Sequence, residues 1–333
     1  MASDLSSSLS TISNHFLKSA LIALLIIICL INFRTLEANT SVSGTISSDT
    51  RWTASNSPYT VTANVTVASG VTLTVDPGVT VKFDSGKVLI VDGDLIARGT
   101  SSDRITFTSS AASPAAGDWG YISFGDDSTD ATFDGNGDYS AGSVLEHCTV
   151  EYGGAYASSS NIHTVTNATF VNYCTFQHNS GTYDLRNNKE NGKVTNSSFK
   201  SGAYLAENAI VTNNTFDEGK LGLGGKYSTS QTVISVQNNT FQNTSTAISF
   251  RQDGFRECFS SSLAMGSGDP CNTQLSLTFS NNLIQDSSIG IETYSFWPIY
   301  SDLPLITIDS NTIIDNSGTA IALGSETPFS FSS

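Results

Sequence analysis

The sequence has few charged residues, and basic residues are the scarcer kind. Asp, Glu, Lys and Arg make up 14% of the 333 residues, and 15 Lys and Arg stand against 30 Asp and Glu, which gives a net charge of −15. So little charge excludes a highly charged disordered chain. The shortage of basic residues argues against nucleic acid as a partner, because a phosphate backbone requires a basic surface.

The N-terminal apolar segment is too short to span a membrane. Residues 20–31 contain no charged residue, but these twelve residues fall short of the roughly 20 that a spanning helix needs. With Lys18 before it and Leu36-Glu37-Ala38 after it, the segment is typical of a signal peptide. We therefore expect residues 1–38 to be a signal peptide and the protein to be secreted or held at the cell surface. An uncleaved membrane anchor is the alternative, because Leu36 is bulky for a cleavage site.

A short phrase recurs seven times in the second half of the chain. Each copy has an apolar residue, two spacers, a marker residue that is Cys, Ser or Asn, a residue that is usually Thr or Ser, and a second apolar residue. The copies are residues 145–150, 171–176, 194–199, 211–216, 236–241, 279–284 and 308–313. The markers are Cys148, Cys174, Ser197, Asn214, Asn239, Asn282 and Asn311. Most steps between markers measure 17 to 29 residues, with one of 43, as expected for the coils of a solenoid in which one coil carries an insertion.

The phrase predicts strands broken by a corner, and a second apolar cluster follows each marker. The clusters contain Leu185, Leu205, Leu221 and Leu223, Ile248 and Phe250, Ile289 and Ile291, and Ile321 and Leu323. Each repeat should therefore hold at least two short strands. Stacked coils would place the phenylalanines from Phe176 to Phe241 in a column with a spacing of about 4.8 Å. The asparagines from Asn214 to Asn311 would form an inward ladder in which each amide bonds to the next coil. Cys148 and Cys174 would be small buried hydrophobes in the same column.

These phrases resemble those of right-handed parallel β-helix proteins of the pectin-lyase-like superfamily. Residues 70–83 and 118–124, which contain further strand-like segments, support the resemblance. It implies an all-β, right-handed parallel β-helix over nearly the whole mature chain. It implies little about activity, because that fold hosts lyases, hydrolases, isomerases, adhesins and proteins without known catalysis.

The mature chain is expected to be a single domain, residues 39–333. Strand-like segments open it at residues 71–75, 79–83, 88–91 and 105–107, and an excursion rich in Gly, Asp and Ser occupies 111–142. No linker divides these parts. The segment after Leu323 is too short to cap an open β-helix end. The C-terminal end is therefore interpreted as truncated, or as covered by a partner through self-association.

Two features suggest a metal ion and a disulfide. Asp134, Asn136 and Asp138 have the alternating oxygen spacing of a calcium loop, although Tyr139 and Leu145 stand where that loop needs Gly and Glu. Calcium is the one cofactor that the sequence suggests, and a solvated turn is the alternative. Cys258 and Cys271 lie in one insertion, and we expect a disulfide between them once the protein is exported.

The insertion 251–274 and the segment 292–304 should leave the same corner of neighbouring coils. Aromatic rings beside carboxylates and arginines suit a sugar polymer. The candidate glycan-binding residues are Arg251, Asp253, Arg256, Glu257, Glu292, Tyr294, Trp297 and Tyr300. The alternative is that these side chains only pin the loops to the solenoid.

A catalytic set is not evident. Outward positions three residues past each marker read Glu151, Gln177, Lys200, Asp217, Gln242, Gln285 and Ile314, without the carboxylate pair that a glycoside hydrolase needs. His147, His163 and His178 lack ligand spacing. The sequence thus favours an exported protein that binds extracellular or cell-surface polysaccharide. The alternatives are a polysaccharide lyase or glycoside hydrolase acting through the 251–304 loops, and a surface adhesin or scaffold.

Overall fold

The computed structural model describes residues 39–155, 163–224, 232–251, 275–293, 305–322 and 329–332, together with Lys18, Ile22 and Ala23. The chain divides into two compact units, residues 1–38 and 39–333. In the described residues, no helix is long and apolar enough to cross a membrane. The predicted signal peptide and the predicted cysteine pair lie outside the described residues, apart from three positions of the former.

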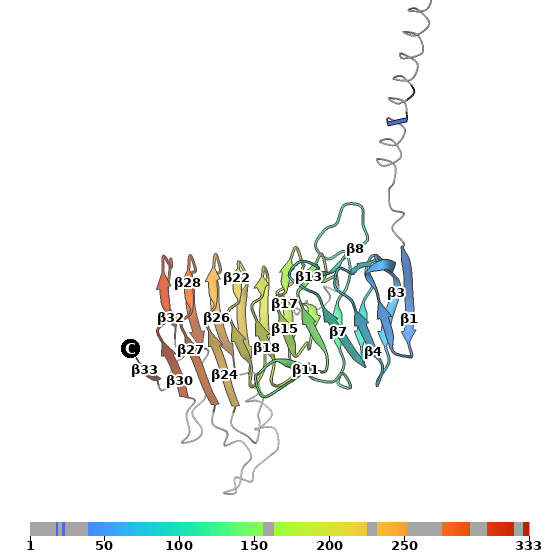
Figure 1. The fold of residues 1–333 in the computed structure, drawn as a ribbon. Coiled ribbons are helices and arrows are strands. Elements are labelled where there is room, and N and C mark those ends of the chain that lie inside the picture. Colours follow the sequence, from blue (N-terminus) through green and yellow to red (C-terminus); the bar gives the residue numbers. More distant parts are fainter. Residues whose placement is uncertain are drawn as a thin grey trace, which may run out of the picture. The chain divides into compact units, whose positions relative to one another are not determined.

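The second unit is a stack of coils, each built from three short parallel strands (Figure 1). The strands fall into three columns, which we call sheet B, column A1 and column A2. The expectation of at least two strands per repeat is confirmed, and a third strand of three to six residues contains the apolar residue at the start of each phrase. The prediction of an all-β parallel β-helix is therefore correct.

Sheet B contains the first strand of each coil. Its members are β2 (Thr50–Trp52), β4 (Thr72–Val75), β7 (Asp94–Arg98), β12 (Val144–Glu146), β15 (Phe170–Asn172), β18 (Lys193–Thr195), β21 (Ile210–Thr212), β24 (Thr232–Gln237), β27 (Leu275–Ser280), β30 (Leu305–Asp309) and β33 (Phe329–Ser332).

Column A1 follows the marker corner. Its members are β5 (Thr80–Phe83), β8 (Ile105–Ser109), β13 (Cys148–Glu151), β16 (Thr175–Gln177), β19 (Ser198–Phe199), β22 (Thr215–Asp217), β25 (Thr240–Gln242), β28 (Leu283–Gln285) and β31 (Thr312–Ile314).

Column A2 completes each coil. Its members are β6 (Leu89–Val91), β9 (Ile122–Phe124), β14 (His163–Thr166), β17 (Tyr183–Asn187), β20 (Gly202–Leu205), β23 (Lys220–Gly224), β26 (Thr246–Arg251), β29 (Ile289–Thr293) and β32 (Ile321–Ala322).

The two A columns join at the N-terminal end of the solenoid. There β1 (Thr40–Ile46) and β3 (Tyr59–Val67) are long enough to serve both columns, since β3 pairs with β5 through Tyr59–Val61 and with β6 through Val65–Val67. A 3-10 helix, η1 (Ala54–Asn56), lies between β2 and β3. An antiparallel hairpin, β10 (Thr132–Phe133) with β11 (Tyr139–Ala141), interrupts the parallel stacking.

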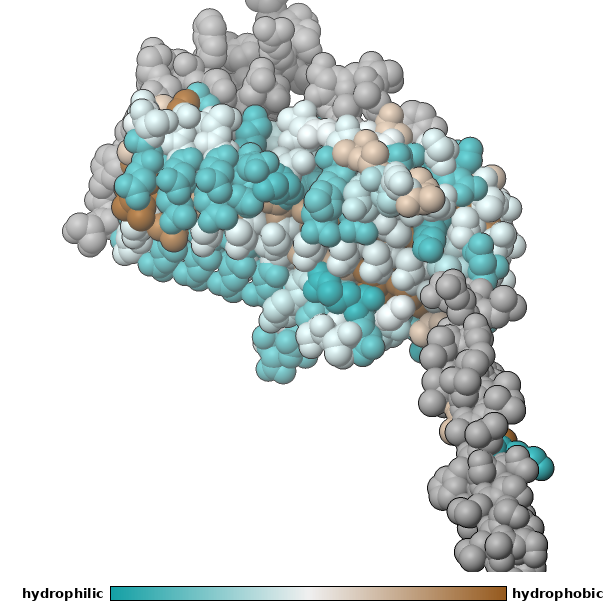
Figure 2. Space-filling model, turned by 90° about the horizontal axis from the view of Figure 1, so that it is seen from above, coloured by the Kyte–Doolittle hydropathy of each residue, from teal (hydrophilic) through white to brown (hydrophobic). Residues whose placement is uncertain are grey.

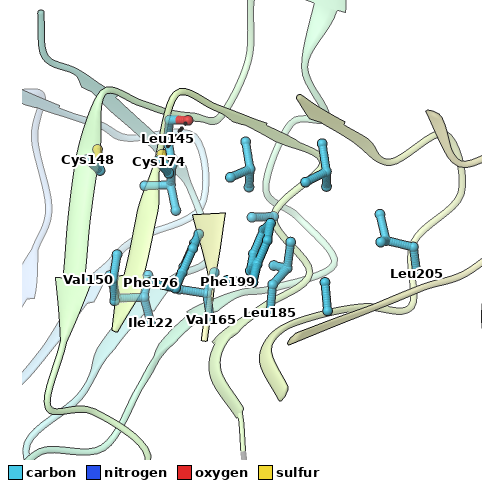
Figure 3. Packing of buried hydrophobic residues seen from close by; sticks show 14 of the residues in the cluster. Ile122, Leu145, Cys148, Val150, Val165, Cys174, Phe176, Leu185, Phe199 and Leu205 are labelled. Carbon is cyan, nitrogen blue, oxygen red and sulfur yellow. Dashed lines mark hydrogen bonds between the residues drawn. The ribbon is translucent and has the colours of Figure 1, made fainter. Parts of the chain in front are cut away.

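The core is a set of columns of identical or similar side chains inside the coils. The rings of Phe176 and Phe199 stack at 4.8 Å, those of Phe199 and Phe216 at 5.1 Å, and those of Phe216 and Phe241 at 4.7 Å. Figure 3 shows the first of these pairs beside Leu185 and Leu205 of column A2. The predicted phenylalanine column is confirmed. Its spacing is that of neighbouring strands.

The corner before each marker has a left-handed backbone. The residue preceding the marker has a positive φ in all seven coils: His147 49°, Tyr173 52°, Asn196 52°, Asn213 59°, Asn238 57°, Asn281 54° and Ser310 52°. This turn reverses the alternation of side chains, so both the apolar residue before the corner and the apolar residue after it face inward. The asparagines suit it, because Asn tolerates the left-handed region better than most residues.

The marker side chains form the predicted inward ladder. The Nδ2 of Asn214 donates to Oδ1 of Asn239 at 3.0 Å, and the same bond links Asn239 to Asn282 at 3.0 Å and Asn282 to Asn311 at 2.8 Å. The backbone N–H of Asn214 donates to the same Oδ1 of Asn239 at 2.9 Å. The ladder therefore satisfies buried corner groups that no strand pairing reaches.

The two cysteines occupy the same column as buried free thiols, as predicted. The thiol of Cys174 donates to the carbonyl of Leu145 at 3.3 Å (Figure 3), and that of Cys148 donates to the carbonyl of Ala97 at 3.5 Å. Each thiol thus reaches back to the preceding coil as the asparagine amides do. Burial raises the pKa of the Cys148 thiol well above its usual value, so the thiol stays protonated.

We predict that Asn239→Leu destabilises the solenoid by at least about 2 kcal/mol, because it leaves buried donors of Asn214 without an acceptor. Asn239→Ser is the matched control, since Ser197 already fills this position in another coil and accepts the N–H of Cys174 at 3.0 Å. It should cost less. Urea unfolding of the full chain measures both variants, and a Leu variant as stable as wild type would contradict the ladder's role.

Candidate functional site

The outer face of column A2 carries one row of outward side chains across five coils. Arg186 pairs in register with Tyr204, Tyr204 with Gly222, Gly222 with Ser249, and Ser249 with Glu292. These positions point outward because side chains alternate between the two faces of a strand. The leucines, isoleucines and phenylalanines next to them in the same strands are fully buried. We call it the A2 row.

Two glycines make room for the tyrosine ring of the A2 row. A Cβ atom on Gly224 would lie 1.7 Å from the Tyr204 hydroxyl, and one on Gly222 would lie 2.8 Å from Cδ2 of the same ring and 2.6 Å from the Tyr183 hydroxyl. Both tyrosines therefore lean over the glycine-containing strand β23. Side chains at 222 and 224 would displace the two tyrosine rings. The absence of a Cβ atom at both glycines therefore lets the rings lie directly over the backbone of β23.

Cations lie against both rings. The Arg186 guanidinium is 5.1 Å from the centroid of Tyr204, and the Lys220 ammonium is 5.7 Å from the centroid of Tyr183. Both distances allow cation–π attraction. The outer face of A2 thus combines aromatic rings with positive charge, in a protein whose overall charge is negative.

His163 borders this group and is largely buried. Its Nε2 lies 3.4 Å from Nη1 of Arg186, and its ring centroid lies 6.0 Å from that of Tyr183. Burial and the charge of Arg186 lower the pKa of His163 from 6.5 to about 4. The ring is therefore neutral at neutral pH, and His163 is a buried neighbour of the A2 row.

The strand frame places the starting points of the two predicted loops on neighbouring, paired strands. The insertion leaves the end of β26 at Arg251 and the second segment leaves the end of β29 at Thr293, in strands that pair through Phe250 and Thr293. Glu292, the last position of the A2 row, is half-buried. The side chain of Arg251 is not described. Asp253, Arg256, Glu257, Tyr294, Trp297 and Tyr300 lie outside the described residues, so their role stays a prediction.

The outward row of column A1 is a hydrogen-bonded polar strip. Gln177 Nε2 donates to Glu151 at 2.8 Å, and Lys200 pairs with Asp217 at 2.8 Å. Gln285 Nε2 donates to Gln242 at 3.5 Å. Figure 2 shows hydrophilic side chains in rows along the solenoid. Among the described residues of this strip, the carboxylates of Glu151 and Asp217 are separated by Gln177 and Lys200.

The acidic excursion forms a hairpin that packs on sheet B. Phe133 meets Phe170 edge-on at 5.0 Å, and the Lys193 ammonium lies 4.1 Å from the Phe133 centroid. Part of the excursion belongs to the solenoid, as the resemblance of residues 118–124 implied: β9 is a column A2 strand. Trp119 is fully buried and stacks on Phe83 at 4.2 Å, which was not predicted.

The tip of this hairpin contains the predicted calcium residues. The Oδ1 of Asp134 accepts the N–H of Asn136 at 2.8 Å and of Asp138 at 3.0 Å. These backbone hydrogen bonds, that of Asp138 first, lower the pKa of Asp134. The carboxylate thus closes the turn itself. No group of three or more His, Cys, Asp or Glu within the described ranges is arranged to hold a metal ion, and the calcium site remains a prediction without support.

Comparison with known proteins identifies the architecture. Residues 44–184 match the model of a family described as a pectate-lyase like beta helix domain. The matched segment is therefore similar to that family, and the structure shows the parallel β-helix that the family description names. The description suggests a protein related to carbohydrate, and the seven-fold phrase extends the same coil beyond the matched segment. Neither the curated proteins nor the solved structures include a significant match.

The environment of His163 predicts a pH-dependent stability. Its folded-state pKa of about 4 lies below the ordinary 6.5, so the unfolded state binds more protons in this interval and stability falls as the pH drops from 6.5 to 4. His163→Gln should reduce that loss, as measured by urea unfolding across the interval. Asp184, whose pKa burial raises to about 6, contributes with opposite sign and cancels in the comparison. Equal pH slopes in the two proteins would contradict the assignment.

Proposed function

We propose that the protein is exported and binds an extracellular or cell-surface polysaccharide along the outer face of column A2. The observation that carries the proposal is the Tyr204 ring, which rests over Gly222 and Gly224 with the Arg186 guanidinium against it. Aromatic rings offer area to the apolar faces of sugars, and the neighbouring polar groups orient the hydroxyls. A row in strand register suits an extended polymer better than a small molecule.

Export is supported by the division of the chain. The boundary between the two compact units falls between Ala38 and Asn39, which is also the cleavage position that the sequence predicts. A protein released there would begin with the first strand of the solenoid.

Binding is favoured over cleavage by the charges in the A2 row. Of its five positions, Glu292 alone is a carboxylate. Hydrolysis of a glycoside by the common mechanisms uses two carboxyl groups roughly 5 to 10 Å apart. The row therefore offers a surface for recognition but only one of the two carboxyl groups that hydrolysis needs.

The binding proposal predicts that Tyr204→Ala weakens polysaccharide binding about tenfold, equivalent to about 1.4 kcal/mol. Gly224→Ala should act in the same direction while leaving the tyrosine in place, because the new Cβ displaces its hydroxyl. Gly135→Ala is the control, since no atom lies within 4 Å of the Cβ position at that hairpin glycine. Affinity electrophoresis against a panel of neutral and acidic polysaccharides measures retardation. Retention of full affinity by Tyr204→Ala would place binding elsewhere.

The second candidate function is a polysaccharide lyase or glycoside hydrolase acting through residues 251–304. The family description favours it, and the paired strand ends at Phe250 and Thr293 favour a shared site for the two segments. Asp253, Glu257 and Glu292 would supply the carboxylates.

The enzyme alternative predicts turnover of at least one polysaccharide, detected as new reducing ends or as unsaturated products. Simultaneous replacement of Asp253, Glu257 and Glu292 by the corresponding amides should reduce it at least a hundredfold, because acid–base groups contribute about that much or more. A demonstrated activity that survives this triple change would exclude the placement. Absence of turnover across the panel, with binding intact, would support the binding protein.

A further inference from the structure

A second surface of interest lies at the corner where sheet B passes into column A1. Five of the seven coils place Asn or Ser at the left-handed position before the marker, whereas two neighbouring coils place His147 and Tyr173 there. The two rings stack at a centroid distance of 4.6 Å and an angle of 3°. An aromatic pair thus replaces the short polar side chains found along the rest of this edge.

Folding alone does not account for Tyr173 at this position. A bulky residue in the left-handed region strains the backbone. Its side chain recovers little of this cost by burial, because Tyr173 is 46% exposed. Stacking on His147 offsets only part of it. Asn, which the next coil carries at the same position as Asn196, would fit the corner at lower cost.

The exposed ring borders a shallow depression of about 310 Å³ that runs along five coils. Along one side of the depression, the large side chain of Tyr173 is followed by the shorter side chains of Asn196 and Asn213. The hydroxyl-bearing residues Thr175, Ser198 and Thr215 also line it, and they pair in register. Their hydroxyls therefore recur at the strand spacing of about 4.8 Å.

A fixed arginine supplies the charge of this depression. Arg104 Nη2 donates to the carbonyl of Cys148 at 2.6 Å and to Oγ1 of Thr175 at 3.2 Å, and its Nε donates to Oγ1 of Thr149 at 3.2 Å. Within the part of the chain that the structure describes, Nη1 has no acceptor. No Asp or Glu lines the depression, although acidic residues outnumber basic ones two to one in the chain.

We propose that this depression binds a saccharide unit that carries an anionic group, a carboxylate or a sulfate. The apolar face of the sugar ring lies on Tyr173, the anionic group accepts from Nη1 of Arg104, and the hydroxyls of Thr175, Ser198 and Thr215 meet those of the sugar. A preorganised guanidinium is well suited to either anion. The site lies on a different column from the A2 row and does not depend on that row's function.

Isothermal titration calorimetry tests the site, with three probes of similar length: oligogalacturonate, sulfated dextran oligosaccharide and unmodified dextran oligosaccharide. The full chain is made in a host without N-glycosylation, because Asn196 and Asn213 each begin an Asn-x-Ser/Thr sequence. At least one anionic probe should bind, and which one identifies the anion. Tyr173→Asn, which copies the next coil, should raise its Kd at least tenfold without lowering the Tm.

Two further variants separate charge from structure and this depression from the rest of the same edge. Arg104→Lys keeps a donor for the Cys148 carbonyl but loses the second terminal nitrogen of the guanidinium. It should therefore also raise the Kd of the anionic probe. Asn238→Ser, in the same edge outside the depression, should leave it unchanged. An unchanged Kd in Tyr173→Asn, or no binding of any anionic probe by wild type, would overturn the site. Equal affinity for the unmodified probe would overturn its anionic specificity.

Discussion

The solenoid depends on the left-handed corner and on the amide ladder inside it. A chain that turns between two sheets must bury backbone N–H and C=O groups at the turn, and leaving them unpaired costs free energy at every coil. Asn239 solves this at one position: its Oδ1 accepts from the coil before it, and its Nδ2 donates to Val211 and to Asn282. The corner of each of the coils from Asn214 to Asn282 is thereby completed by the next, so one residue type fixes the register of these four coils.

That constraint decides where variation is allowed. Inside the coils, side chains at equivalent positions must stack on one another, as the rings from Phe176 to Phe241 do. Outward positions and the segments between columns carry no such requirement. The two surfaces with aromatic rings and cations, the A2 row and the depression beside Tyr173, both lie at such positions. Function in this fold is therefore added to the scaffold without altering the ladder that holds it.

The sequence predicted the structural features that repeat from coil to coil, but it did not predict the features that occur only once. The ladder from Asn214 to Asn311 and the phenylalanine column follow from a period that is visible in the residues. Sheet B was not recognised as a third sheet, because strands of three residues such as β18 are too short to show alternation. The burial of Trp119 and the place of Tyr204 over Gly222 could not be predicted either, since both depend on side chains of neighbouring coils. Most of the predicted loop residues lie outside the described ranges.

Contacts between cations and aromatic rings have different roles at sheet B and on column A2. At sheet B, Lys193 and Arg98 lie over Phe133 and Tyr139, which belong to the hairpin, so these cations fasten an added segment to the coils. On column A2, the rings of Tyr183 and Tyr204 come from the strands themselves, whose pairing already holds them in place. Among the described residues, Arg186 and Lys220 lie against rings of the solenoid's own strands and not against an added segment. A cation beside a ring that projects from a rigid strand is a combination suited to a ligand.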